Sequence, residues 1–376
     1  RSEGPIFKIC YQIHKLITLT FTGKSIKFGN FTCLPKTTVE KLGIPMKEIL
    51  TRLTQHEKLS RQEAKEALLF IGSGAADLYQ VTTFLSVYMM RSIDVAELAG
   101  FKDALLELCV AVDLAAYNPI DLCGTGGDGK DTFNISTLAS FVTAGAGIHV
   151  AKHGNYGVSS SCGSSNVMEH LGIHFSNDAD FLERCIDQTG ICVLHAPLFH
   201  PAMKHVAPIR RALQLKTFFN MLGPLVNPCV PKLQIVGVFN LALMRLYGYL
   251  FQNSDKQFCV LHALDGYDEI SLTGATKIIS NKGEQLVRPV DFGLKPLAAE
   301  AIGGGNTVED AAAIFIAVLQ DKGTVAQKQV VCANAGTAIA TALDISITEG
   351  YAKAQESIES KKALGAFTKL LALSKA

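Results

Sequence analysis

Several features that define other classes of protein are absent from this sequence. No apolar run approaches the roughly 20 residues needed to span a bilayer, and no basic leader precedes an apolar core with a small-residue cleavage site. The ten cysteines are scattered and form no C-x-x-C pair, which argues against a zinc site or a disulfide scaffold. We therefore expect a cytoplasmic protein with reduced, packed thiols and no membrane partner.

The chain also lacks an appreciable net charge. Its 35 Lys and Arg residues and 34 Asp and Glu residues leave +1 at pH 7, so nothing draws it generally toward nucleic acid. With 376 residues it is long enough for one large or two ordinary domains. We expect an enzyme without a nucleic-acid partner.

Positive charge gathers in residues 1–45. Seven Lys or Arg residues stand there against two acids, so this segment carries +5 and the remainder of the chain −4. The segment contains no methionine and ends just before Met46, the first methionine of the chain. We interpret it as an extension of unknown role. A transit peptide is the alternative, although Arg and Ser are scarce in the segment.

Acidic residues are missing from one long stretch, residues 132–168, which follows a glycine-rich turn. The turn comes after an expected buried strand, residues 119–123, and glycines let several backbone N–H groups face one space. Its glycines are Gly124, Gly126, Gly127 and Gly129. Ser136 or Thr137 is expected to cap the apolar helix that follows, whose N-terminus adds positive potential. The turn therefore predicts a phosphate site.

Three other interpretations of this turn can be weighed. The glycines satisfy G-x-G-x-x-G, but a dinucleotide site needs an acid about 20 residues further on. The next strand, near residues 148–151, ends instead in Lys152 and His153. A Walker A loop needs Lys followed by Ser or Thr, whereas Lys130 precedes Asp131. A purely structural turn is the third interpretation, which the acid-free stretch disfavours.

Together these segments resemble the anthranilate phosphoribosyltransferases. The family pattern G-T-G-G-D, T-F-N-I-S-T, K-H-G-N, S-S, G-S and L-E-x-L-G fits this chain in order and spacing. The matching segments are residues 124–128, 132–137, 152–155, 159–160, 163–164 and 168–172. A second pattern, R-x-x-L-G followed by T-x-F-N-x-L-G-P-L-x-N-P, is matched from Arg210 to Pro228. The resemblance covers most of the chain after Met46.

The resemblance implies transfer of the phosphoribosyl group of phosphoribosyl pyrophosphate to anthranilate, in tryptophan biosynthesis, without a protein nucleophile or base. The residues that it implies for phosphoribosyl pyrophosphate are Gly124, Gly127, Asp128, Thr132, Asn134, Ile135, Ser136, Thr137, Lys152, Ser160 and Ser164. Those that it implies for anthranilate are Gly124, His153, Asn155 and Arg210. The Arg210 guanidinium would form a two-pronged pair with the carboxylate.

A magnesium site is expected at Asp268 and Glu269, adjacent acids that follow a strand-like segment. Carboxylates together with substrate phosphate oxygens suit Mg²⁺, and we add the Ser136 hydroxyl to the site. Lys152, Asp268 and Glu269 would support the transition state as pyrophosphate leaves. For an isolated acidic pair, a solvated turn is the alternative interpretation.

Strand-like and helical segments alternate in the second half of the chain, which predicts an α/β domain with a mostly parallel central sheet and flanking helices. One further strand is expected near residues 270–272. Earlier in the chain, Ser60 and Glu63 form a capping box, and apolar residues recur at helical spacing from Leu78 to Tyr88 as core positions. The fold class is therefore α/β with an additional small all-helical domain.

The domain division follows from these patterns. We expect residues 46–112 and about 197–228 to form the helical domain, and residues 113–196 and about 229–376 to form the α/β domain that binds phosphoribosyl pyrophosphate. The family resemblance implies a homodimer formed through the helical domain.

Three positions depart from the family pattern. Tyr156 replaces the Arg of K-H-G-N-R, Asn166 replaces Asp, and Gln214 replaces the Gly of R-x-x-L-G. Two other functions are known for this fold. A pyrimidine-nucleoside phosphorylase would carry Lys-His-Ser before T-G-G, where this chain has residues 122–124, and would lack the magnesium pair. A non-catalytic nucleic-acid-binding paralogue would show a strongly basic surface, which the charge of −4 after residue 45 disfavours.

Overall fold

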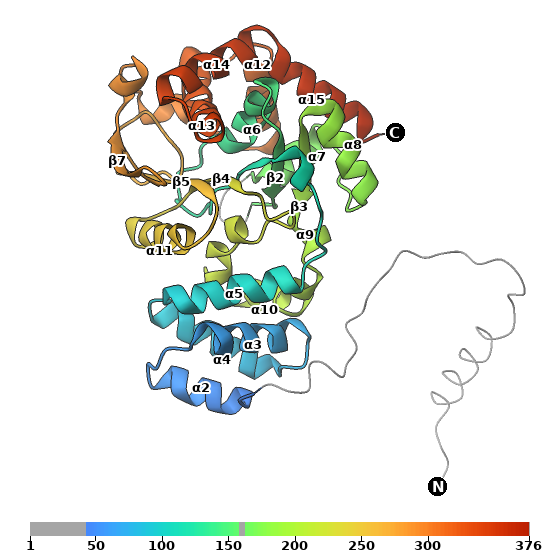
Figure 1. Cartoon of the computed structure of the whole chain (residues 1–376), viewed down its shortest axis with the longest axis vertical. Coiled ribbons are helices and arrows are strands. Elements are labelled where there is room, and N and C mark those ends of the chain that lie inside the picture. Colours follow the sequence, from blue (N-terminus) through green and yellow to red (C-terminus); the bar gives the residue numbers. More distant parts are fainter. Residues whose placement is uncertain (1–42, 158–161, 376) are drawn as a thin grey trace, which may run out of the picture. The chain divides into compact units, whose positions relative to one another are not determined.

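Residues 43–157 and 162–375 are described by the computed structural model of the chain (Figure 1). The first described helices are α2 (Met46–Thr54), α3 (Arg61–Gly72), α4 (Leu78–Met90) and α5 (Val95–Glu107). Helix α3 begins with the expected capping box. Ser60 Oγ accepts from the Glu63 N–H at 3.3 Å, and a Glu63 carboxylate oxygen accepts from the Ser60 N–H at 2.8 Å.

Apolar side chains of these helices form one of two buried clusters. Phe84, Phe101 and Phe218 are fully buried, and the Phe101 and Phe218 rings stack with centroids 4.6 Å apart. Such aromatic contacts stabilise a core beyond the burial of their area. The apolar stripe expected along α4 is buried from Val81 onward, but Leu78 was wrongly expected in the core. It is the first residue of the helix and is 56% exposed.

Residues 196–225 form short helical turns. They are α9 (Ala196–Phe199), η3 (Pro201–His205), α10 (Ala207–Leu213), η4 (Phe218–Met221) and η5 (Gly223–Leu225), where η denotes a 3₁₀ helix. Helix α10 ends at Gln214, which has a left-handed φ of 52° and donates its N–H to the Arg210 carbonyl at 3.1 Å. Gln214 thus adopts the cap conformation that Gly usually supplies, and the helix end is preserved.

The α/β part is built on a seven-stranded sheet in the order β3-β2-β1-β4-β5-β6-β7. The strands are β1 (Ile120–Leu122), β2 (Val150–Gly154), β3 (Ile191–His195), β4 (Leu233–Gly237), β5 (Gln257–Ala263), β6 (Thr276–Ser280) and β7 (Gly283–Val287). Strands β1 to β5 pair in parallel, and β6 and β7 add two antiparallel strands at one edge. The expected fold class is confirmed.

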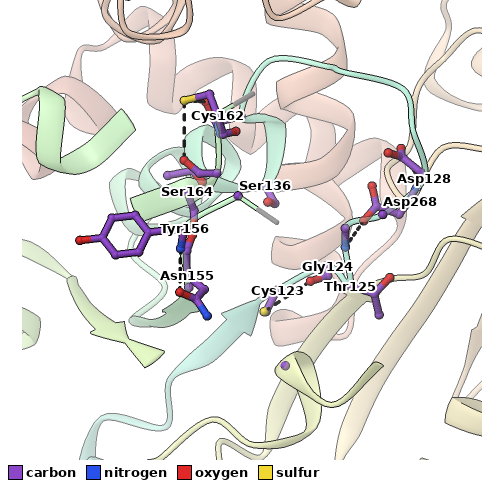
Figure 2. A pocket seen from close by; sticks show the side chains of 18 of the residues that line it. Cys123, Gly124, Thr125, Asp128, Ser136, Asn155, Tyr156, Cys162, Ser164 and Asp268 are labelled. Carbon is purple, nitrogen blue, oxygen red and sulfur yellow. Dashed lines mark hydrogen bonds between the residues drawn. The ribbon is translucent and has the colours of Figure 1, made fainter. Parts of the chain in front are cut away.

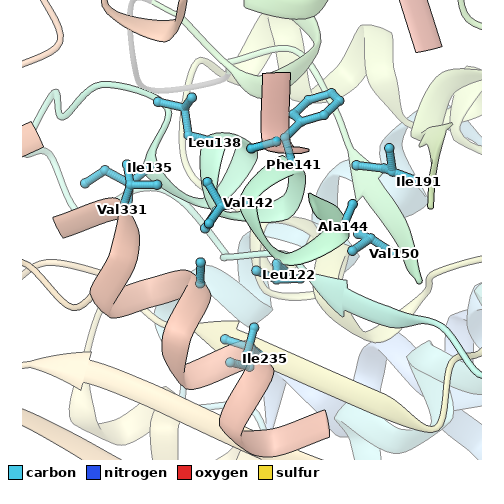
Figure 3. Close-up of a cluster of buried hydrophobic side chains, with 14 of the residues drawn as sticks. Leu122, Ile135, Leu138, Phe141, Val142, Ala144, Val150, Ile191, Ile235 and Val331 are labelled. Carbon is cyan, nitrogen blue, oxygen red and sulfur yellow. The ribbon is translucent and has the colours of Figure 1, made fainter. Parts of the chain in front are cut away.

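Helices cover both faces of this sheet (Figure 1). The cluster on one face receives α6 (Ile135–Gly145), α7 (Ser164–His170), α8 (Ala179–Thr189), α12 (Val308–Leu319), α13 (Val325–Leu343), α14 (Ile347–Glu359) and α15 (Lys362–Leu373). The other face packs against α11 (Leu241–Gln252) and joins the cluster of α2 to α5. Figure 3 shows the first cluster, in which Val142 of α6 points toward Leu122 of the sheet and Phe141 points to the other side of the helix.

The strand expected near residues 270–272 is absent from the described fold. The Ile270 N–H donates to Asn334 Oδ1 at 3.0 Å, and Asn334 Nδ2 donates to the Ile270 carbonyl at 3.0 Å. A side chain of α13 therefore satisfies the backbone groups that a neighbouring strand would otherwise pair. The sheet instead continues from β5 to β6, which begins at Thr276.

The structure also bears on the expectations about membrane-spanning segments and cysteines. Within residues 43–157 and 162–375 no single helix has the length and apolar character to cross a membrane, and only the bent pair α13 and α14 meets that test jointly. The eight cysteines of these ranges are free thiols, four of them buried.

Candidate active site

A pocket opens beyond the carboxyl ends of the central parallel strands, close to β1 and β4, where the strand order changes direction. In open α/β sheets, ligands bind at such a switch point. The cavity measures ≈ 280 Å³. Figure 2 shows Asp128 and Asp268 on one side of it and Asn155, Tyr156 and Ser164 on the other. The pocket therefore draws on segments from both halves of the sheet.

The predicted site residues that the structure describes all line this pocket. They are Gly124, Gly127, Asp128, Thr132, Asn134, Ile135, Ser136, Thr137, Lys152, His153, Asn155, Ser164, Arg210, Asp268 and Glu269. Ser160 lies outside the described residues. Their individual roles remain predictions, but the residues share one cavity although they are widely separated in sequence.

The glycine-rich loop owes its path to left-handed backbone conformations. Gly126, Gly127 and Gly129 have φ values of 62°, 82° and 73°, which side chains with a Cβ rarely adopt. The Gly126 N–H donates to an Asp268 carboxylate oxygen at 2.7 Å, and the Asp268 N–H donates to Asp128 Oδ2 at 3.3 Å. The loop after β1 and the turn after β5 are therefore tied together at the pocket.

Helix α6 begins beside this loop. Its N-cap is Asn134, so the expectation of Ser136 or Thr137 was wrong. Asn134 makes no side-chain cap, since its amide faces Cys162: Nδ2 donates to the Cys162 carbonyl at 3.1 Å, and Oδ1 accepts from Cys162 Sγ at 3.7 Å. The Ser136 N–H, one of the amides that a helix leaves unpaired at its start, donates to a Glu269 carboxylate oxygen at 3.1 Å. The positive end of the α6 dipole thus lies at the pocket.

Strands β1 and β2 pair at their first residues and are joined by side chains nearer the pocket. Asp121 Oδ1 accepts from the His153 N–H at 3.0 Å, and Lys152 Nζ donates to the Leu122 carbonyl at 2.8 Å. Lys152 is 1% exposed. A buried ammonium in the wall of the pocket offers a strong attraction for a phosphate group.

Asp268 and Glu269 carry unusual electrostatics. Burial raises the pKa of both carboxyl groups, and the charge of Asp128 adds to the effect on Asp268, as that of Asp268 does on Glu269. Ionisation of both acids is therefore unfavourable without a counter-charge, and a bound cation would stabilise their charged forms.

The donor chemistry of this acidic pair fits Mg²⁺. Each acid uses one carboxylate oxygen to accept a backbone N–H, and the other oxygen makes no hydrogen bond to the residues described. In the part of the chain that the structure covers, no three His, Cys, Asp or Glu side chains converge to hold a metal alone. Substrate oxygens would have to complete the coordination, as is usual for Mg²⁺.

The opposite wall of the pocket carries His153. Its Nδ1 lies 2.9 Å from the Gly223 carbonyl, so we assign the ring hydrogen to Nδ1. Burial, and next the neighbouring His200, lower the pKa of His153 to about 3. The imidazole is therefore neutral, and its buried Nε2, which has no partner among the described residues, is a hydrogen-bond acceptor.

Arg210 reaches the same pocket from α10. Its guanidinium carbon lies 5.4 Å from the centroid of the Phe219 ring, and Nη2 donates to Asn220 Oδ1 at 3.2 Å. Burial lowers the pKa of Arg210, yet its ordinary value is so high that the group stays charged. The Phe219 ring supports the guanidinium from one face, and the paired N–H donors of a guanidinium suit a carboxylate.

Sequence reasoning missed several contacts of the pocket. Lys216 Nζ donates to the Gly127 carbonyl at 2.6 Å across 89 residues of chain, and no pattern in the sequence indicates this contact. The contacts of Tyr156 and Asn166 could have been suspected, because both residues lie next to matched motifs. The Tyr156 hydroxyl donates to Glu169 at 3.3 Å. Asn166 Oδ1 accepts two backbone N–H groups at 2.9 and 3.0 Å, so the amide serves as an acceptor where the family has Asp.

Comparison with known proteins identifies the family. Two family models match, the helical bundle domain of a glycosyl transferase family over residues 47–109 and its α/β domain over residues 116–364. The anthranilate phosphoribosyltransferase of Flavobacterium psychrophilum is 64% identical over 329 residues, which are 88% of this chain and 100% of that protein. This chain belongs to the anthranilate phosphoribosyltransferase family. The resemblance drawn from the motifs is confirmed.

Other members extend the comparison. The anthranilate phosphoribosyltransferase of Bacteroides fragilis is 51% identical over 329 residues, 87% of this chain and 99% of that protein. The structure of the Thermus thermophilus enzyme has a TM-score of 0.82 at 31% identity and covers 87% of this chain and 99% of its own. The Saccharomyces cerevisiae enzyme, solved with phosphoribosyl pyrophosphate and Mg, has a TM-score of 0.81 at 25% identity. The match covers 88% of this chain and 98% of the yeast chain.

Proposed function

We propose that this chain transfers the phosphoribosyl group of phosphoribosyl pyrophosphate to the amine of anthranilate, releasing pyrophosphate, as a step of tryptophan biosynthesis. One observation carries the proposal. A single pocket combines an amide-rich anion site, two adjacent buried acids and a positively charged guanidinium over an aromatic ring. These features match, in turn, the phosphates, a divalent cation and an aromatic carboxylate. The names of the curated relatives support the same activity.

The glycine loop and the start of α6 would hold phosphoribosyl pyrophosphate. Backbone N–H groups and the α6 dipole attract phosphate, and Lys152 adds a full charge. The hydroxyls of Thr132, Ser136, Thr137, Ser160 and Ser164 and the amide of Asn134 would complete these contacts. The Lys216 contact to Gly127 ties the loop to the segment that follows α10.

Asp268, Glu269 and the Ser136 hydroxyl would hold Mg²⁺ against the substrate. When bound, the ion neutralises charge that develops on the pyrophosphate leaving group. The yeast relative was solved with phosphoribosyl pyrophosphate and Mg, which supports magnesium as the ion that accompanies this substrate.

Anthranilate would occupy the side of the pocket formed by His153, Asn155 and Arg210. The guanidinium would bind the carboxylate, and His153 Nε2 would accept a hydrogen from the amine, so that the nitrogen lone pair is directed at C1 of the ribose. The carbon–nitrogen bond forms as the bond from C1 to the pyrophosphate oxygen breaks, and the nitrogen loses one proton, which is released with pyrophosphate. Positioning of two reactants in one cavity accounts for much of the rate of such a transfer.

The two alternative functions are not favoured. The relatives at 50–64% identity are anthranilate phosphoribosyltransferases. A phosphorylase would also leave the Arg210 guanidinium without a carboxylate to bind. A nucleic-acid-binding role would require a basic surface, which the balance of charge after residue 45 does not provide.

We also propose a homodimer formed through the helical domain, with the domain boundaries expected from the sequence. Tyr79 and Met90, at the two ends of α4, are 78% and 85% exposed, and a second copy of the chain would cover such apolar side chains. Sedimentation of the full chain tests the dimer. Cytoplasmic localisation is a further prediction, for which cell fractionation is the test.

The activity is tested by mixing the protein with anthranilate, phosphoribosyl pyrophosphate and Mg²⁺ and following the loss of anthranilate fluorescence. We expect loss of signal only when all three are present, and formation of pyrophosphate in equal amount. Omission of each component in turn is the control. Persistent anthranilate fluorescence in the complete mixture would refute the proposal.

A further inference from the structure

Arg210 has neutral surroundings within the described residues. Its contacts there are the Phe219 ring and Asn220 Oδ1, and no carboxylate of residues 43–157 or 162–375 pairs with it. Its Nε is buried without a hydrogen-bond partner. By contrast, the buried guanidinium of Arg91 is neutralised by the Glu97 carboxylate in the helical part. The positive charge of Arg210 is therefore not compensated by the chain.

The Asn220 amide is held in one orientation. Its Oδ1 accepts from Arg210 Nη2 at 3.2 Å and from the Thr217 N–H at 3.1 Å. Because both partners are donors, the atom that they share must be the carbonyl oxygen and not the amide nitrogen. The Asn220 N–H in turn donates to the Thr217 carbonyl at 3.0 Å, which fixes the backbone of the residue. Asn220 thus gives the guanidinium a rigid, neutral support.

An acid at this position would satisfy the same two donors. An aspartate accepts hydrogen bonds at least as well as an asparagine, so local geometry alone does not require the amide. An aspartate would, however, form an ion pair with Arg210 inside the pocket. A guest carboxylate would then meet a neutralised guanidinium and a second negative charge.

We propose that Asn220 is a positioning and specificity-determining residue of the acceptor site. Its oxygen orients the Arg210 guanidinium, and its neutrality leaves that charge for the carboxylate of an anionic aromatic acceptor. The inference rests on the proposed function and adds to it the reason why the pocket selects an anionic ring.

Two substitutions separate charge from geometry. Asn220→Asp keeps the acceptor for Thr217 and Arg210 but adds a negative charge, whereas Asn220→Ala removes the acceptor and leaves Arg210 unpaired. We expect Asn220→Asp to raise KM for anthranilate about tenfold or more, as when a charge-assisted hydrogen bond is lost. The KM for phosphoribosyl pyrophosphate should stay within about twofold, because the change leaves the phosphate contacts intact. Asn220→Ala should raise KM for anthranilate less. Asn253→Asp, at an exposed position after α11, is the matched control.

A purely structural role for Asn220 predicts the reverse order, with the alanine variant more impaired than the aspartate variant, and that order would overturn the inference. A neutral competitor, 2-aminobenzamide, gives a second readout. Asn220→Asp should weaken anthranilate but not 2-aminobenzamide, and Asn220→Ala should retain the preference for the anion. If Asn220→Ala no longer prefers anthranilate to 2-aminobenzamide, the inference is overturned. This readout does not depend on whether the aspartate variant folds.

The outcomes distinguish this inference from the proposed function. If the unaltered protein consumes no anthranilate, the function itself fails. If it does, but Arg210→Ala weakens both substrates equally, the assignment of Arg210 fails. If Arg210→Ala weakens anthranilate alone and Asn220→Asp has no effect, then only the role of Asn220 is wrong.

Discussion

At the residue scale, the sequence indicates which side chains gather but not how they are supported. The predicted residues from Gly124 to Glu269 that the structure describes share one pocket, because short motifs specify chemistry that the fold must bring together. The supports were missed. Asn220 contacts Arg210, which lies in a different helical turn, and Lys216 contacts Gly127, which is 89 residues away in sequence. Such contacts depend on tertiary packing, which local patterns do not encode.

The fully buried Asp121 gives a prediction at this scale. Burial raises its pKa to about 6, above the ordinary 3.8. The folded state favours the protonated form, so ionisation of Asp121 lowers the free energy of unfolding as pH rises from 3.8 to 6. Above pH 6 the full loss of stability, about 3 kcal/mol, is present. Asp121→Asn removes this penalty and keeps an acceptor for the His153 N–H.

The stability of Asp121→Asn relative to the unaltered protein should therefore increase by up to about 3 kcal/mol between pH 4 and pH 7. Urea unfolding at several pH values measures this difference, since the other groups titrate alike in both proteins. Asp187→Asn, at an exposed acid of α8, is the matched control. A difference that does not change with pH would show that burial does not perturb Asp121.

At the element scale, prediction succeeded where a segment carries its own pattern. Helix α4 covers the periodic apolar stretch from Leu78 to Tyr88, and the capping box of α3 lies within four residues. It failed where a side chain replaces a backbone partner, as Asn334 does for Ile270. It also failed at the start of α6, because neighbouring polar residues compete to cap a helix and the surrounding loop decides between them.

The turn after β5 gives a prediction for an element. Changing Asp268 to Asn and Glu269 to Gln removes both charges but keeps oxygen acceptors for the Gly126 and Ser136 N–H groups. The loop and α6 should therefore stay in place, while turnover falls by at least a hundredfold, about 3 kcal/mol of lost stabilisation of the leaving group. Steady-state rates across a range of Mg²⁺ concentrations measure the effect.

Excess Mg²⁺ should restore little activity to this double variant, and circular dichroism should match that of the unaltered protein. Glu356→Gln with Glu359→Gln, two exposed acids of α14, is the control for removing two charges. Near-normal turnover with unchanged Mg²⁺ dependence would place the metal elsewhere.

At the scale of the whole molecule, the two buried clusters are assembled from residues between Met46 and Leu370. The family models match from residue 47 onward, and 88% of this chain covers the whole of the Flavobacterium psychrophilum relative. The alternation of helices and strands was sufficient to predict the α/β class. The contact of α2 to α5 with one face of the sheet was not predictable, since apolar helix faces look alike whatever they pack against.

A chain that begins at Met46 should therefore fold and retain the activity of the full chain. The first described helix starts at that residue, and the pocket is lined from Cys123 onward. The truncation removes the partly buried Ile44, which packs against the helical cluster, but no fully buried side chain of either described cluster. We expect kcat and both KM values within about twofold of the full chain, and a free energy of unfolding unchanged within about 0.5 kcal/mol, as for changes away from a core. Parallel urea unfolding and fluorescence assays of the two proteins measure these quantities.

A chain starting at Ala64 is the matched control, because it lacks the buried residues of α2 and the capping box of α3 and should not fold. Loss of soluble protein or of activity in the chain that begins at Met46 would show that residues 1–45 belong to the fold.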